Sequence, residues 1–233
     1  MARKIAALVC LWSVVACRKG DGNAGRASTQ PIQPAPSAVP ADNRPVVLFF
    51  GTSLTAGLGL EPDEAYPTLI QRKLDSAGLA FRAVNAGLSG ETSAAGLRRI
   101  DWILQQPVAV LVLELGANDA LRGLELQAAK NNLQEIIDHT RAKYPDVRLV
   151  VAGMEAPPNL GARYTREFRQ IFVDLARENH AALIPFLLEG VGGVDSLNQR
   201  DGIHPNVAGE RIVARNVWKV LEPILRRGSA ATR

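Results

Sequence analysis

The residues best placed to do chemistry in this chain start with Ser53, which follows a short apolar run and a glycine. Residues 46–50 are apolar throughout, which predicts a buried strand that ends near Gly51. A serine at the carboxyl end of such a strand either caps a helix or acts as a nucleophile. Serine is a weak nucleophile without an adjacent base. The choice between the two interpretations therefore depends on the bases that the chain supplies.

The chain contains three histidines, so each can be considered in turn as that base. His139 falls on the polar side of one predicted helix, and His180 falls at the end of another. His204 lies in a loop after a predicted strand, which makes it the candidate base for Ser53. Asp201 precedes His204 by three residues, close enough in a tight loop to hold the imidazole. In the alternative, His204 flanks the last helix and Asp201 forms a turn.

Cysteine chemistry is excluded from most of the chain. Both cysteines, Cys10 and Cys17, lie within the first seventeen residues. The remainder has no internal disulfide, no thiolate metal site and no cysteine nucleophile, and we expect neither a metal nor a cofactor. Positive and negative side chains are interspersed and the formal net charge is +4, so nucleic-acid binding is not indicated.

The elements that must position these residues alternate between apolar strands and amphipathic helices. The predicted strands are 46–50, 81–86, 108–115, 147–152 and 182–184, and the predicted helices are 65–77, 92–104, 126–143, 165–179 and 207–225. This alternation predicts an α/β fold: a five-stranded parallel sheet between two helical layers, a three-layer α/β/α sandwich. With the flavodoxin-like order 2-1-3-4-5, the loops after the first three strands lie side by side.

Four blocks that follow strands resemble those of the SGNH (GDSL-type) hydrolase superfamily. The blocks are GTSLTAG at 51–57, NAGLSGETS at 85–93, ELGANDALRG at 114–123 and DGIHPN at 201–206. One such block recurs by chance, whereas four in this order form a strong signal. In finer detail they resemble the branch of bacterial thioesterase I, lysophospholipase L1 and arylesterases. The resemblance implies a serine hydrolase that acts on carboxylic esters or thioesters of acyl chains.

The resemblance also implies a role for each matching residue. Ser53 is the nucleophile, and Asp201 and His204 complete its triad. The backbone N–H groups of Ser53 and Gly87 and the side-chain amide of Asn118 form the oxyanion hole, which stabilises the tetrahedral intermediate. Glycine at this point lets the backbone approach the substrate closely.

Two positions near the predicted site need separate interpretation. The family usually has Asp before the nucleophile, where this chain has Thr52, and we expect altered loop rigidity or rate with the mechanism retained. Glu114 lies within an apolar strand and must be paired if it is buried. Arg122 and Arg163 are the candidate partners, and we interpret Glu114 as structural.

The first seventeen residues have the pattern of a secretory signal. Arg3 and Lys4 precede an apolar run that is shorter than the about 20 residues needed to span a bilayer. The run ends directly at Cys17, which resembles the bacterial lipoprotein cleavage box and implies lipidation. An ordinary cleaved signal with an incidental cysteine is the alternative.

The segment after this signal predicts a tether and then one domain. Residues 18–44 are rich in Gly, Ala, Ser and Pro, which predicts a flexible linker, and the hydrolase domain spans 45–233. We expect an exported monomer in the periplasm, held to the membrane by an N-terminal lipid anchor. Arg18 is not the acidic residue associated with inner-membrane retention, so the resemblance favours the outer membrane.

Other functions remain open at this point. The same triad would serve a carbohydrate or cell-wall O-acetyl esterase, because neither fold nor triad separates these substrate classes. A non-catalytic lipoprotein that binds an acyl ligand is a further alternative. Leu124 and Leu160, which follow the third and fourth strands, are expected to line an acyl channel.

Overall fold

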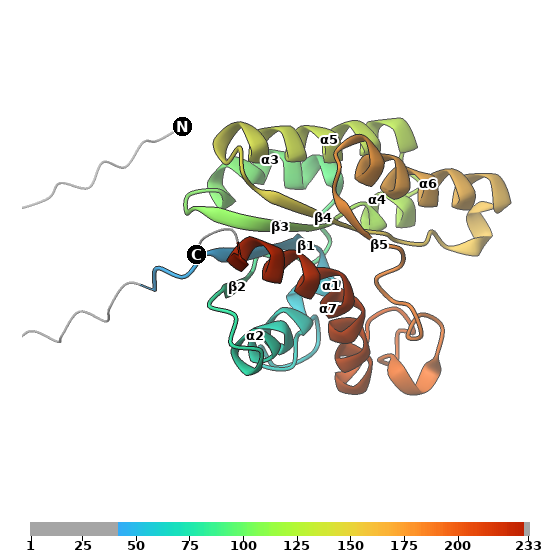
Figure 1. The fold of residues 1–233 in the computed structure, drawn as a ribbon. Helices are drawn as coiled ribbons and strands as arrows, with labels where there is room; N and C mark the ends of the chain where they lie inside the picture. Colours follow the sequence, from blue (N-terminus) through green and yellow to red (C-terminus); the bar gives the residue numbers. More distant parts are fainter. Residues whose placement is uncertain (1–41, 231–233) are drawn as a thin grey trace, which may run out of the picture. The chain divides into compact units, whose positions relative to one another are not determined.

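Five parallel strands form a sheet whose order confirms the prediction (Figure 1). The computed structural model describes residues 42–230. Within them, the strands are β1 (Val46–Gly51), β2 (Arg82–Asn85), β3 (Val108–Glu114), β4 (Arg148–Ala152) and β5 (Ala182–Ile184). Neighbouring strands run parallel in the order β2-β1-β3-β4-β5. The carboxyl ends of β2, β1 and β3 therefore lie side by side at one edge.

Helices cover both faces of the sheet and produce the predicted α/β/α sandwich. The α-helices are α1 (Ser53–Ala56), α2 (Tyr66–Ser76), α3 (Ser93–Ile103), α4 (Ala117–Leu121), α5 (Leu126–Lys143), α6 (Ala162–Glu178) and α7 (Val207–Ala230). Two 3₁₀ helices are η1 (Pro158–Leu160) and η2 (Asp195–Leu197). α3, α5 and α6 cover one face, whereas α2 and α7 pack together on the other (Figure 1).

The core lies where the apolar helix faces meet the sheet. Every residue of β1 is buried, and so is every residue of β3 except Ala109. Along α5 the buried side chains recur at helical spacing, as predicted, at Ala129, Leu133, Ile136, Ile137 and Thr140. Phe49 of β1 packs edge-to-face against Tyr66 of α2, with ring centroids 5.6 Å apart. This close packing holds the strand ends rigidly, so the residues that follow them are fixed in position.

Several element boundaries differ from the sequence prediction for local reasons. The prediction missed α1 and α4, because helices of four and five residues are too short to show a helical period. α6 begins at Ala162 instead of residue 165. Gly161, with a φ of +87°, lies between the end of η1 and the start of α6. α7 continues past residue 225 and carries Pro223 within it.

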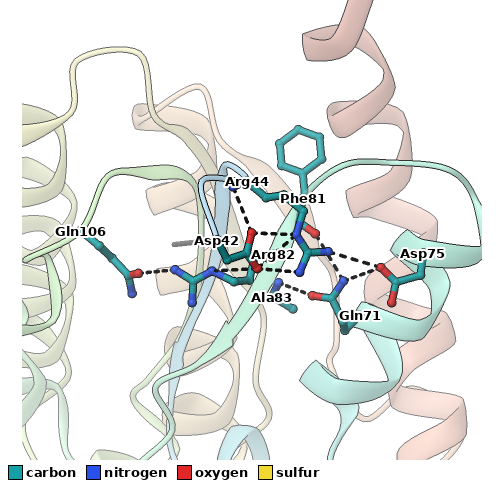
Figure 2. A network of polar contacts seen from close by, with 8 residues as sticks. All are labelled: Asp42, Arg44, Gln71, Asp75, Phe81, Arg82, Ala83 and Gln106. Atoms are coloured by element: carbon teal, nitrogen blue, oxygen red, sulfur yellow. Dashed lines mark hydrogen bonds and ion pairs between the residues drawn. The ribbon is translucent and has the colours of Figure 1, made fainter. Parts of the chain in front are cut away.

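A polar network holds the start of the described chain at the amino edge of the sheet (Figure 2). Arg44 Nε and Nη2 donate to the Asp42 carboxylate at 2.9 and 2.7 Å, and Arg44 Nη1 lies 3.5 Å from Asp75 Oδ1. Arg82 Nε lies 3.8 Å from Asp42 Oδ2. The compact unit therefore starts at Asp42, earlier than the predicted boundary at residue 45.

The predictions for the N-terminal segment concern residues outside the described part of the chain. They are the signal peptide at 1–17 with its lipidation residue Cys17, and the linker up to residue 41. Between residues 42 and 230, no helix is long and apolar enough to cross a membrane. The same residues contain no group of three or more His, Cys, Asp or Glu side chains that could hold a metal ion.

Candidate active site

Ser53 lies just after β1, where the chain turns into the short helix α1. Thr52 occupies the N-cap position of α1 without a side-chain cap bond, and Ser53 is the first residue of the helix. The Ser53 hydroxyl points instead toward the loop before α7, with its Oγ atom 2.8 Å from His204 Nε2. Ser53 therefore does not cap α1, and its hydroxyl is held against a base.

Asp201 holds the imidazole of His204 from its other side. Asp201 Oδ2 lies 2.7 Å from His204 Nδ1, while Asp201 Oδ1 accepts the backbone N–H groups of Ile203 and His204 at 2.9 and 3.0 Å. These two N–H groups, and then the His204 side chain, lower the pKa of Asp201 to about 2. The ionised carboxylate accepts the Nδ1–H, so Nε2 is left to accept the proton of the Ser53 hydroxyl.

The loop that carries His204 is tied to the segment that follows α1. Gln199 Nε2 donates to the backbone oxygens of Leu58 and Pro205 at 2.7 and 3.0 Å, and the Gln199 N–H donates to His204 O at 2.7 Å. These bonds fix the distance between the two loops that meet at the Ser53 hydroxyl. Gln199 was not among the predicted site residues, because an amide that bridges positions 141 residues apart leaves no local pattern.

The two remaining histidines lie away from Ser53. His139 Nδ1 is 3.0 Å from Asp101 Oδ1, a contact between exposed side chains of α5 and α3. His180 is exposed just after α6 and has a φ of +47°. The position of His204 thus agrees with its selection by elimination.

The structure does not place Gly87 at the site, which corrects its predicted role in the oxyanion hole. The Gly87 N–H donates to Asn85 Oδ1 at 2.9 Å and is therefore not available to a substrate. A Cβ atom at Gly87 would lie 2.3 Å from the backbone nitrogen of Ala56. Glycine is required here so that the loop after β2 can pack closely against α1.

Gly90, in the same sequence block, lies at the site instead. A cavity of about 880 Å³ is lined by Gly90 together with Ser53, Asn118 and His204. Asn118 donates one amide N–H to Glu91 O at 3.0 Å, which orients the side chain and leaves a second amide hydrogen. The cavity thus brings together the candidate nucleophile Ser53, the candidate base His204 and two hydrogen-bond donors.

The remaining cavity wall is largely apolar. It includes Leu121 after β3, Pro157 after β4 and Ile203 beside the histidine. Leu121 and Ile203 are 52% and 47% exposed, which is high for large apolar side chains. The prediction that Leu124 and Leu160 line this wall is wrong, because neither contributes to it and Leu160 packs against the hydrophobic core.

Comparison with known proteins places this geometry in a family. Residues 49–212 match the GDSL-like Lipase/Acylhydrolase family, and this match covers more than half of the chain. The chain belongs to the GDSL-like lipase/acylhydrolase family. Its similarity to Esterase TesA of Pseudomonas aeruginosa is 39% identity over 180 residues, which covers 77% of this chain and 89% of the relative. Thioesterase 1/protease 1/lysophospholipase L1 of Escherichia coli K12 is 36% identical over 185 residues, 78% of this chain and 86% of the relative.

Solved structures of family relatives share the fold. The crystal structure of TesA matches with a TM-score of 0.72 and 39% identity, covering 76% of this chain and 98% of that one. The psychrotrophic esterase EstA from Pseudoalteromonas sp. matches with a TM-score of 0.73 and 30% identity, covering 78% and 98%. The parallel sheet and its helical layers are thus those of the GDSL-like family.

In this GDSL-like chain, Glu114 is buried and no arginine of residues 42–230 pairs with it, which corrects the expected ion pair. Arg122 donates instead to Gly90 O at 3.0 Å, and Arg163 Nε pairs with Glu167 at 2.7 Å. Glu114 has no exposed surface and accepts hydrogen bonds from the chain on both sides of the nucleophile. Burial raises the pKa of Glu114 to about 7, against the lowering effect of these bonds.

Proposed function

We propose that this protein is a serine esterase that hydrolyses carboxylic esters or thioesters of acyl chains. One observation carries the proposal: Ser53 Oγ lies 2.8 Å from His204 Nε2, and His204 Nδ1 lies 2.7 Å from Asp201 Oδ2. This hydrogen-bonded row ends at a cavity of about 880 Å³. Membership of a lipase/acylhydrolase family supports it, as do relatives named as an esterase, a thioesterase/lysophospholipase and an arylesterase.

The proposed reaction proceeds in two steps through an acyl-serine. In the first, Ser53 Oγ attacks the carbonyl carbon while His204 Nε2 takes the hydroxyl proton. His204 then gives this proton to the leaving alcohol or thiol as the carbon–oxygen or carbon–sulfur bond breaks. In the second step, water attacks the acyl-serine, with the same histidine as base and then as acid. Asp201 stabilises the imidazolium that forms in each step.

The proposed oxyanion hole differs from the sequence prediction in one member. The donors are the backbone N–H groups of Ser53 and Gly90 and the side-chain amide of Asn118, which all line one cavity. Gly90 has a φ of +78° and its carbonyl oxygen is held by Arg122, so the orientation of the loop is fixed before substrate binds. Fixed donors stabilise the tetrahedral intermediate without reorganisation during the reaction.

The substrate class follows from the composition of the cavity wall. Leu58, Leu121 and Ile203 contribute large apolar surfaces around the hydroxyl of Ser53, which suits an acyl chain. The substrate of a carbohydrate O-acetyl esterase instead carries a small acyl group on a polar scaffold. Hydrolysis of acyl-CoA, lysophospholipid and an acetylated glycan by the same preparation distinguishes the two classes. We expect turnover of acyl esters or thioesters to exceed that of the glycan.

The proposed role of Ser53 is tested by its replacement. In the full chain, Ser53→Ala removes the nucleophile, and we expect hydrolysis of p-nitrophenyl butyrate to fall to background while the circular dichroism spectrum is unchanged. Wild-type turnover by this variant would overturn the proposal. A folded wild-type protein that does not react with a fluorophosphonate would favour the alternative of a non-catalytic acyl-binding lipoprotein.

The cellular location is part of the same proposal. We infer that Cys17 carries lipid, that residues 18–41 tether a monomeric domain in the periplasm and that the anchor lies in the outer membrane. The support is the sequence pattern that ends at Cys17. Cells fed an alkyne fatty acid should label the wild type and the matched control Cys10→Ser, but not Cys17→Ser. Equal labelling of both variants would contradict the anchor.

A further inference from the structure

A buried carboxylate contacts residues 52–55, the turn that carries Ser53, which we call the nucleophile turn. Glu114, the last residue of β3, has no exposed surface. Its Oε2 atom accepts the backbone N–H of Thr52 at 2.8 Å and the hydroxyl of Thr55 at 2.8 Å, and its Oε1 atom accepts the hydroxyl of Thr52 at 3.0 Å. Among the described residues, no Lys, Arg or His forms an ion pair with Glu114. The carboxylate is therefore compensated by neutral donors alone.

These three bonds converge on the two sides of Ser53. Thr52 precedes the nucleophile, and Thr55 follows it by two residues within α1. A helix of four residues is not stable on its own, and Thr52 provides no side-chain cap to it. The orientation of α1, and with it the Ser53 hydroxyl, is therefore set by contacts outside the helix, of which Glu114 supplies three.

Gly51 provides the space for this arrangement. A Cβ atom at Gly51 would lie 2.1 Å from Thr55 Oγ1 and 2.5 Å from Glu114 Oε2. The backbone φ of Gly51 is not left-handed, so the reason for glycine here is space. Gly51 and Glu114 also face each other in the pairing of β1 with β3. The carboxylate thus links the ends of the strands that precede Ser53 and Asn118.

A second buried carboxylate in the same cluster serves a different segment. Tyr66 OH lies 2.8 Å from Thr55 Oγ1, and the Tyr66 backbone N–H donates to Glu210 Oε2 at 2.7 Å. Glu210 belongs to α7 and is 1% exposed. It therefore holds the start of α2, whereas Glu114 holds the nucleophile turn. The two residues are matched in type and burial and differ in what they hold.

We propose that Glu114 is a positioning residue that fixes the Ser53 hydroxyl for attack by holding Thr52 and Thr55. The inference rests on the proposed function, since it concerns the same nucleophile. At position 52, threonine supplies a hydroxyl to Glu114, whereas an Asp would put a second carboxylate against it.

The test compares Glu114→Gln with Glu210→Gln in the full chain. Each variant keeps the side-chain volume, and each is assayed well below its own Tm. For Glu114→Gln we expect kcat with p-nitrophenyl butyrate, and the rate of Ser53 labelling by a fluorophosphonate, to fall together by about tenfold or more, with KM within about twofold. For Glu210→Gln we expect kcat and labelling rate within about threefold of wild type.

Two outcomes would overturn the role of Glu114. One is a Glu114→Gln variant that is folded and retains its labelling rate, and the other is an equal loss in both variants, which indicates a general structural effect. Labelling of the wild type, and its absence in Ser53→Ala, establish the nucleophile independently. Failure of the positioning role is therefore distinguishable from failure of the proposed function.

A second pair of variants keeps the proposal testable if Glu114→Gln does not fold. Thr52→Val is nearly isosteric but removes the hydroxyl bonded to Glu114, whereas Thr52→Ser keeps a hydroxyl. We expect the labelling rate of Thr52→Val to fall by about tenfold and that of Thr52→Ser to recover most of this loss. Equal labelling rates in the two variants would contradict the role assigned to the Thr52–Glu114 bond.

Discussion

Asp42 and Asp201 are two aspartates of similar exposure at opposite edges of the sheet. Their side chains are 39% and 44% exposed, and the pKa of each is lowered to about 2. At Asp42 the main cause is the side chain of Arg44, followed by its backbone N–H. At Asp201 the main causes are the backbone N–H groups of His204 and Ile203, followed by the His204 side chain.

The difference lies in what each partner can do next. Arg44 keeps its charge at all ordinary pH values, and its contacts end at other charged side chains of the amino edge. The His204 imidazole can accept a proton and give it up again, which a guanidinium cannot do, and its second nitrogen lies 2.8 Å from Ser53 Oγ. A lowered pKa therefore does not by itself identify a catalytic carboxylate. What distinguishes Asp201 from Asp42 is the type of partner residue and the group that this partner contacts in turn.

The largest expected losses of activity come from Ser53 and His204, which end the hydrogen-bonded row that starts at Asp201. We expect Ser53→Ala and His204→Ala each to lower kcat/KM by about 10⁴-fold or more, because neither group attacks or transfers a proton without the other. The double variant should be no slower than the slower single variant. Steady-state kinetics with p-nitrophenyl butyrate measure all three, and losses that multiply would show that the two residues act independently.

The direct comparison of the two aspartates is the next test. Asp201→Asn removes the charge that orients and stabilises the imidazole, and we expect kcat to fall by about 10³–10⁴-fold. Asp42→Asn disrupts an exposed ion pair far from the cavity and serves as the matched control, with kcat within about twofold of wild type. Similar kcat values for the two variants would remove the distinction drawn between the edges.

An amide pair extends the comparison to the oxyanion hole. Asn118→Ala removes a proposed donor to the developing negative charge, and we expect kcat to fall by about 10²–10³-fold with a much smaller change in KM. Asn132, whose amide donates to Ser93 Oγ at 2.9 Å and does not line the cavity, provides the control Asn132→Ala. A loss that appears in KM alone would assign Asn118 to binding and not to transition-state stabilisation.

The smallest expected effect concerns stability, where two buried glutamates differ from the two aspartates. Burial raises the pKa of Glu114 to about 7 and that of Glu210 to about 8. The folded state therefore binds these protons more tightly than the unfolded chain, so stability is lost as pH rises from about 5 to 8. The loss is on the order of 1 kcal/mol or more per group.

Urea unfolding at pH 5, 6.5 and 8 measures this effect. We expect Glu210→Gln to flatten the fall in unfolding free energy relative to wild type, because glutamine does not titrate. Control measurements on Asp42→Asn should keep the wild-type slope over this range, since the pKa of Asp42 lies below it. A wild-type protein that is more stable at pH 8 than at pH 5 would contradict the assigned directions.

The sequence predicted the layers of this fold because its elements are periodic and long enough to show it. The buried face of α5 and the apolar β1 were assigned correctly, as was the strand order. α1 was missed because four residues carry no period. Local pattern thus predicts elements that bury a continuous face, and fails for short helices fixed by tertiary contacts.

Within the site, the predictions depended on spacing along the chain. Asp201 and His204 are three residues apart, so a single tight loop brings them together. Gly87 and Gly90 are also three residues apart, but only the fold of their loop decides which of the two faces the cavity. The partners of Glu114 lie about 60 residues away and are neutral, whereas an arginine partner was predicted. Contacts of this kind leave no periodic or motif signal.

Reaction of the full chain with a fluorophosphonate, followed by peptide mass spectrometry, shows whether Ser53 is the activated nucleophile. Nucleophilic serine reacts with this reagent only when a base activates it. We expect one modified residue, Ser53, with labelling that disappears in His204→Ala and persists in His139→Ala. No modification of the folded wild type, or modification that persists in His204→Ala, would contradict the account.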